Sequence, residues 1–145
     1  MDTVYSNISS STMLRVYGTR PKGFQSVLIP HILKMIAGAI PSSPILMVQP
    51  TGSGKSAVPA TVAVVDGGVT IVIENTLALA ADQCSKIVSN AMDTSSQSIR
   101  PYHLDMIKND NEIDEISSSI ISHCAHNKST SFILFTSPET LHQRN

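Results

Sequence analysis

Residues 45–56 read Ile-Leu-Met-Val-Gln-Pro-Thr-Gly-Ser-Gly-Lys-Ser, and this stretch decides the fold that the sequence predicts. Its first four residues are apolar and lie between prolines, which is typical of a short buried strand. The next residues are rich in glycine and serine and lead into a segment that can begin a helix. A strand, a glycine-rich loop and a helix in this order indicate an α/β fold with a parallel sheet.

The loop of residues 51–56 has the composition of a phosphate-binding loop. Glycines let successive backbone N–H groups point at one phosphate, and a helix N-terminus adds partial positive charge. Lys55 is expected to reach the β and γ phosphates, and the Ser56 hydroxyl to bind Mg²⁺. The pattern G-x-x-x-x-G-K-[ST] is met except at its first position, Gln49, and the alternative is a surface turn that happens to end in Lys-Ser. The predicted phosphate-binding residues are Thr51, Gly52, Ser53, Gly54, Lys55 and Ser56.

Strands and helices alternate downstream of this loop. Runs of apolar residues predict strands at 69–73 and 132–135, and a weaker strand is expected around 99–104. Apolar residues at helical spacing predict helices over 77–91 and 111–124, and Ser137 is expected to cap a further helix. The alternation predicts a parallel sheet with helices on both faces. The residues expected on the buried helix faces are Leu77, Ala80, Ala81, Cys84, Ile87, Val88, Ile113, Ile116, Ile120 and Ile121.

Upstream of the loop, residues 1–15 are polar and Ser-rich and are expected to form a flexible arm. A single domain is then expected over residues 16–145. It begins with a turn at residues 20–23, followed by a helix whose apolar residues recur at helical spacing from Leu28 to about residue 36.

Residues 61–73 allow two interpretations. The Asp-Gly pair at residues 66 and 67 lies between two β-branched runs, which is a signal for a β-hairpin. We prefer a helix followed by a parallel strand, because the phosphate loop requires a helix to begin directly after it. Pro59 opposes this choice and predicts a short or kinked helix.

Composition limits the classes of protein that this chain can belong to. Of its 145 residues, 41% are hydrophobic and 14% are charged, which suits a globular domain, and the net charge of −1 gives no basic field for nucleic acid. No apolar run is long enough to span a bilayer, and no signal peptide is expected. Cys84 and Cys124 are too few for a disulfide scaffold, and His123, Cys124 and His126 lack the spacing of a zinc site.

Four segments together resemble RecQ-like DNA helicases of superfamily two. Gln-Pro-Thr-Gly-Ser-Gly-Lys-Ser at residues 49–56 resembles motif I, and residues 17–25 resemble motif zero, in which Gln25 matches the glutamine that reads adenine. Residues 72–83 resemble motif Ia with its Asp-Gln ending, although Asn75 replaces the usual proline. Residues 135–141 resemble motif Ib. The resemblance covers about residues 16–142.

The resemblance implies an incomplete RecA-like P-loop NTPase domain that binds ATP and Mg²⁺, with Lys55 as a catalytic residue and Ser56 on the metal. It also implies nucleic acid as a partner, DNA rather than RNA, contacted through Thr76, Ser137 and Glu139. An intracellular protein is expected, nuclear if eukaryotic, with no membrane segment.

The chain departs from the family because no Asp-Glu-x-His occurs up to Asn145. That box and a second RecA-like domain are expected beyond the C-terminus, and the isolated chain is expected to be inactive. The alternatives are a catalytically inert nucleotide-binding fragment and an unrelated P-loop kinase or GTPase.

Overall fold

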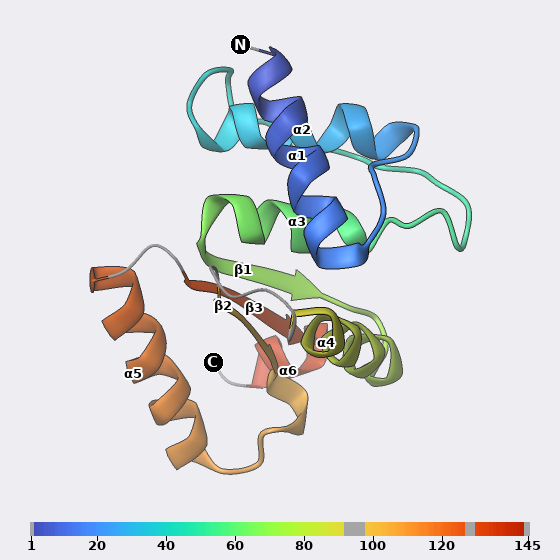
Figure 1. Ribbon diagram of the computed structural model, residues 1–145. Coiled ribbons are helices and arrows are strands. Elements are labelled where there is room, and N and C mark those ends of the chain that lie inside the picture. Colours follow the sequence, from blue (N-terminus) through green and yellow to red (C-terminus); the bar gives the residue numbers. More distant parts are fainter. Residues whose placement is uncertain (1, 92–97, 127–129, 144–145) are drawn as a thin grey trace. The chain divides into compact units, whose positions relative to one another are not determined.

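The computed structural model describes residues 2–91, 98–126 and 130–143 (Figure 1). The chain forms two compact units, Met1–Asp66 and Gly67–Asn145. The first unit is helical and carries the phosphate loop, whereas the second unit contains the sheet. Each unit is described by itself.

Three helices build the first unit, α1 (Asp2–Tyr17), α2 (Phe24–Ile36) and α3 (Ala57–Asp66). The predicted helix after the turn at residues 20–23 is confirmed as α2. The prediction of an irregular N-terminal arm is wrong, because α1 is a helix that contributes to a common core. Its polar sequence hides this, since only a few apolar side chains face the core. That core is formed by Met13, Ile29, Leu33, Val58 and Val62.

Residues 45–48 do not form the predicted strand. They run as an irregular segment in which Leu46 is 90% and Val48 is 81% exposed, while Met47 packs against the helical core. In the described part of the chain no strand pairs with this segment. A strand needs a partner for its backbone N–H and C=O groups, so the apolar sequence alone does not create one.

The helix that we preferred after the phosphate loop is present as α3, and the hairpin alternative is wrong. Pro59 is the third residue of α3 and lies within its first turn, where a missing N–H breaks no helical hydrogen bond. The helix spans ten residues, and because Pro59 lies in its first turn, this length is not a consequence of the proline.

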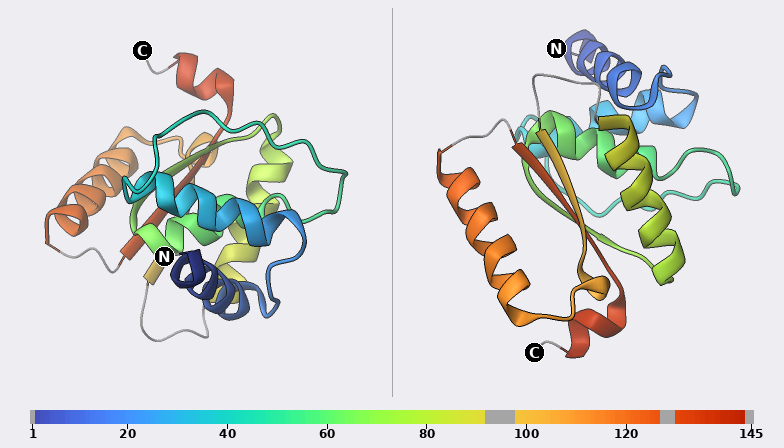
Figure 2. Two further views of the ribbon diagram at one scale, coloured as in Figure 1. Left: turned by 90° about the horizontal axis from the view of Figure 1, so that it is seen from above. Right: turned by 60° about the horizontal axis from the view of Figure 1, so that its bottom comes forward.

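The second unit contains a three-stranded parallel sheet of β1 (Gly68–Ile73), β2 (Ser98–His103) and β3 (Thr130–Thr136), in the order β1-β3-β2. Val69 is paired with Phe132, and Arg100 is paired with the same residue from the other side. The carboxyl ends of all three strands therefore lie at one edge of the sheet (Figure 2). The predicted parallel α/β architecture is confirmed, and strand β3 is the buried centre of it.

Helices α4 (Leu77–Ala91) and α5 (Asp110–His126) lie on opposite sides of the sheet (Figures 1 and 2). His123 of α5 packs edge-on against the ring of Phe132, at 5.6 Å between ring centres. The predicted stripes are only partly correct. Ala80, Ile87 and Ile116 are buried, whereas the exposed members are Leu77, Ala81, Val88 and Ile121.

A one-turn helix, η1 (Leu104–Met106), follows β2, and α6 (Pro138–Gln143) follows β3. Both lie at the carboxyl edge of the sheet, which the segments that resemble motifs Ia and Ib cross as they pass from a strand into a helix. In the described part of the chain, no helix is both long enough and apolar enough to cross a bilayer.

Candidate functional site

Three consecutive backbone N–H groups of the predicted phosphate loop, residues 51–56, have no acceptor in the described part of the chain. The turn is closed by Ser53 N–H donating to Pro50 O at 3.3 Å and Ala57 N–H donating to Gly54 O at 3.2 Å. By contrast, the N–H groups of residues 54–56 donate to no acceptor within the described part of the chain. They precede the first turn of α3, where an anion gains from the positive end of the helix.

Gln25 reaches this loop from the second residue of α2. Its Nε2 donates to Gly54 O at 2.8 Å, and its Oε1 accepts from Lys22 N–H at 2.9 Å. The residue is 4% exposed, so the amide is almost entirely enclosed. The structure thus brings together two predicted site residues, Gln25 and Gly54, that are 29 positions apart.

Two glycines are needed for different reasons. Gly52 and Gly54 both have positive φ angles, of 78° and 89°, which other residues adopt only at a cost. A Cβ atom on Gly52 would meet nothing within 4 Å, whereas one on Gly54 would lie 2.6 Å from Gln25 Nε2. Gly54 therefore permits both the backbone turn and the close approach of Gln25.

The Lys55 side chain is turned onto the loop itself. Its Nζ donates to Gln49 O at 2.9 Å and to Pro50 O at 2.7 Å. A phosphate oxygen carries more negative charge than a peptide carbonyl, so a bound phosphate would compete for this ammonium. The hydroxyl of Ser53 is buried without a hydrogen-bond partner among the described residues, which leaves a further polar group in the loop unsatisfied.

The donor set also fits the magnesium ion that the resemblance implies. Ser56 is exposed, and its hydroxyl has no hydrogen bond within the described residues. Mg²⁺ keeps several waters and also binds substrate phosphates, so the Ser56 hydroxyl would supply one of its oxygen ligands beside a bound phosphate. No group of three or more His, Cys, Asp or Glu side chains that could hold a metal ion occurs in the described residues.

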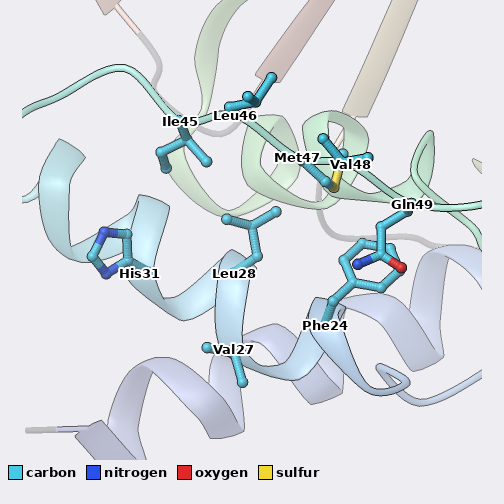
Figure 3. Close-up of a pocket in the computed structure, with 9 residues that line it drawn as sticks. All are labelled: Phe24, Val27, Leu28, His31, Ile45, Leu46, Met47, Val48 and Gln49. Carbon is cyan, nitrogen blue, oxygen red and sulfur yellow. The ribbon is translucent and has the colours of Figure 1, made fainter.

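An apolar groove, which we call the α2 groove, lies beside the phosphate loop in the first unit. Its volume is about 570 Å³, and it runs between α2 and residues 45–49 (Figure 3). Phe24 and Gln49 line one end, and His31 lines the other. The remaining walls are apolar and consist of Val27, Leu28, Ile45, Leu46, Met47 and Val48.

The predicted nucleic-acid residues lie at the carboxyl edge of the sheet in the second unit. Thr76 caps α4, because its Oγ1 accepts from Leu79 N–H at 3.3 Å. Ser137 and Glu139 line an open groove of about 410 Å³ that we call the edge groove. Its other lining residues are Asn75, Leu77, Asp105 and Thr140, so it contains two carboxylates and no basic side chain.

Asp105 holds the start of α6. Its carboxylate accepts hydrogen bonds from Ser137 N–H at 3.0 and 3.1 Å, from the Ser137 hydroxyl at 2.5 Å, and from the Thr140 hydroxyl. His103 Nε2 lies 3.4 Å from the same carboxylate, and both side chains are over 90% buried. Burial raises the pKa of Asp105, but the bonds from Ser137 and Thr140, with His103 nearby, outweigh it and lower the pKa.

Sequence reasoning missed Asp105, His103 and the α2 groove. The His-Leu-Asp triplet at residues 103–105 has no recognisable pattern, and its partners lie more than 30 residues away. The carboxylate stands between the imidazole and the hydroxyl, so this cluster does not have the order of a nucleophilic triad.

Neither models of known protein families nor curated proteins match this chain. Its chemistry is therefore interpreted from its own residues and geometry.

Proposed function

We propose that this chain is the ATP-binding part of an ATP-dependent nucleic-acid helicase, similar to the RecQ group. The loop of residues 51–56 binds the phosphates of ATP, and Ser56 binds the accompanying Mg²⁺. In a full-length protein, hydrolysis would drive the unwinding of DNA. An intracellular location, nuclear if eukaryotic, belongs to the same proposal.

The observation that carries this proposal is the hydrogen bond between Gln25 and Gly54. The resemblance matches these residues to two separate motifs, and the first unit brings them into contact. A glycine and serine turn with no ligand role would have no reason to enclose a glutamine from another helix, nor to leave three consecutive N–H groups free.

Lys55 supplies the mobile cation of the site. Binding of ATP would exchange its two carbonyl partners for phosphate oxygens, and the ammonium would then stabilise the charge that develops on the γ phosphate. Because the carbonyls of Gln49 and Pro50 compete for the ammonium, we expect weak binding of nucleotide by this chain.

The test is titration of the purified chain with Mg²⁺ and ATP, comparing the parent with Lys55→Ala. A charge-assisted hydrogen bond contributes about 1.5–3 kcal/mol, so the affinity is expected to fall roughly tenfold to a hundredfold. Lys86→Ala is the matched control, because Lys86 is an exposed lysine that pairs only with Asp82 on the surface of α4. Equal ATP affinity in all three proteins would contradict the phosphate-loop assignment.

A catalytically inert nucleotide-binding module is the second candidate, favoured by the absence of Asp-Glu-x-His from the sequence. Hydrolysis needs a carboxylate that orients water and an arginine on the developing charge, and losing an arginine finger alone costs roughly 10³ to 10⁵ in rate. We expect no helicase-like phosphate release by this chain, with or without single-stranded DNA. Release stimulated by DNA would exclude the inert module, and competition between ATP, GTP and CTP would separate both candidates from a GTPase.

Contact with nucleic acid would depend on few groups of this chain. The Ser137 N–H and hydroxyl already bond to Asp105, and the edge groove contains carboxylates but no cation. Binding of a nucleic-acid strand would depend on backbone and hydroxyl groups, such as that of Thr76, and would be weak at physiological salt. Anisotropy of a labelled oligonucleotide at low salt tests it, with Thr76→Ala as the variant.

A further inference from the structure

Both ends of the Gln25 side-chain amide form hydrogen bonds within the protein. One end of the amide donates to Gly54 O, the other accepts from Lys22 N–H, and the residue has 4% of its surface exposed. An amide in this position can hold the phosphate loop in shape. It offers little surface on which a nucleobase could lie.

The α2 groove, in contrast, is open and leads to the loop. Its volume of about 570 Å³ could hold a nucleobase, and its walls are mostly apolar, although the groove is open to solvent. Gln49 lines the groove at one end, and its backbone carbonyl accepts a hydrogen bond from Lys55 Nζ at 2.9 Å. A ligand whose phosphates lie on the loop would therefore enter the groove at Gln49.

Two side chains at this end suit a planar base. The half-buried Phe24 presents an aromatic ring, and stacking on a ring favours any base. The Gln49 amide has no hydrogen bond within the described residues, and it can both donate and accept, as the edge of adenine requires. Figure 3 shows these two side chains at the same end of the groove.

We propose that the α2 groove binds the base of the nucleoside triphosphate, with Phe24 against its face and Gln49 on its edge, while Gln25 is a positioning residue for the loop. The inference rests on the proposed function, since it assigns the base end of the same ligand. It also transfers to Gln49 the contact with the base that the resemblance implied for Gln25, and it gives a function to the residue that departs from the phosphate-loop pattern.

The experiment measures the binding of three probes, ATP, GTP and inorganic tripolyphosphate, each with Mg²⁺. Gln49→Ala is expected to leave tripolyphosphate affinity unchanged and to reduce the preference for ATP over GTP roughly tenfold, since a bidentate contact discriminates by about 1–3 kcal/mol. Gln49→Glu conserves volume but only accepts hydrogen bonds. It should shift the preference toward GTP, because guanine offers N–H donors at N1 and N2, whereas adenine N1 is an acceptor.

Phe24→Leu keeps an apolar side chain and should weaken ATP and GTP equally, with no effect on tripolyphosphate. Gln25→Ala should weaken all three probes by the same factor, because it acts on the loop. The matched control is Ser26→Ala, since Ser26 lies on α2 outside the groove, with its hydroxyl on Gly23 O. Circular dichroism of each variant shows whether the helices are retained.

The outcomes distinguish this inference from the proposed function. If Gln49→Ala keeps the base preference and Gln25→Ala erases it, Gln25 reads the base and the inference is wrong. If the parent binds tripolyphosphate as tightly as ATP, the groove holds no base, although the phosphate loop still functions. If the parent binds none of the three probes, the proposed function fails, and the inference fails with it.

Discussion

Two apolar runs of similar composition adopt different structures in this protein, one a buried strand and the other an exposed irregular segment. Residues 45–48 and residues 132–135 each precede a turn and the start of a helix, α3 in one case and α6 in the other. The second run lies in β3, paired on both sides, and Phe132, Ile133 and Phe135 are almost fully buried. The first run is unpaired, and Leu46 and Val48 are among its exposed residues.

The difference lies in the available partners and not in hydrophobicity. Strands β1 and β2 satisfy the backbone groups of β3 from both sides, whereas only helices pack near residues 45–48 in the first unit. Each run nevertheless ends in a turn that a distant polar side chain holds. Gln25 holds the phosphate loop and Asp105 holds the start of α6. The comparison therefore predicts different energetic consequences for mutations in the two runs and in their anchors.

The largest effect is expected at Phe132, which is fully buried at the centre of the sheet. Phe132→Ala removes its packing against His123 and Tyr102 and should lower the free energy of unfolding by about 3–5 kcal/mol. Urea denaturation measures this, with Phe132→Leu as a milder control. A loss below 1 kcal/mol would show that β3 is not the core of the second unit.

Asp105→Asn tests the anchor of the second run. The substitution conserves shape but removes the negative charge that accepts hydrogen bonds from Ser137 N–H and from the Ser137 and Thr140 hydroxyls. We therefore expect the free energy of unfolding to fall by about 1.5–3 kcal/mol. Asp82→Asn, which affects only an exposed pair with Lys86, should cost less than about 1 kcal/mol. Similar costs in the two variants would contradict a specific role for the Asp105 cluster.

The same anchor predicts a pH dependence. The pKa of Asp105 is lower in the folded chain than its ordinary value of 3.8, so its ionised form stabilises the fold above that value. This contribution is lost as the pH falls from 3.8 through the lower pKa of the folded state. The difference in unfolding free energy between the parent and Asp105→Asn should therefore shrink as the pH falls below 4. A difference that grows as the pH falls below 4 would contradict the lowered pKa.

Gly54→Ala tests the anchor of the first run, with Gly52→Ala as its pair. Both substitutions place a Cβ on backbone with positive φ, which costs about 1–2 kcal/mol. Only the change at Gly54 also displaces the Gln25 amide. Gly54→Ala should thus be the more destabilising variant and the one that weakens tripolyphosphate binding further. Equal effects would mean that Gln25 does not hold the loop.

Leu46→Ala should have the smallest effect. The side chain is 90% exposed, so its removal should change the unfolding free energy by less than about 0.5 kcal/mol, although the same residue type in a strand core would cost several times more. Thermal unfolding of the variant measures this. A large loss would indicate that residues 45–48 are buried in solution and would break the comparison between the two runs.

Local patterns predicted much of this structure. Helix α4 spans the predicted residues 77–91, strand β1 contains the predicted run 69–73, and Ser137 caps α6 as expected, since Thr140 N–H donates to its hydroxyl at 3.3 Å. These elements follow from periodicity and capping chemistry, which act over a few residues. The turn that begins at Thr51 likewise follows from its glycines, because Gly52 and Gly54 adopt the positive φ angles that such a turn needs.

The sequence by itself determined the alternation of helices and strands in the second unit and the helix that follows residues 51–56. Tertiary structure alone decided that α1 is a helix in a core, that residues 45–48 stay unpaired, and which side chains anchor the two turns. The contacts of Gln25 with Gly54 and of Asp105 with Ser137 span 29 and 32 residues. Burial makes such contacts strong because water no longer competes for the buried groups, and no local pattern reveals which distant residues will meet.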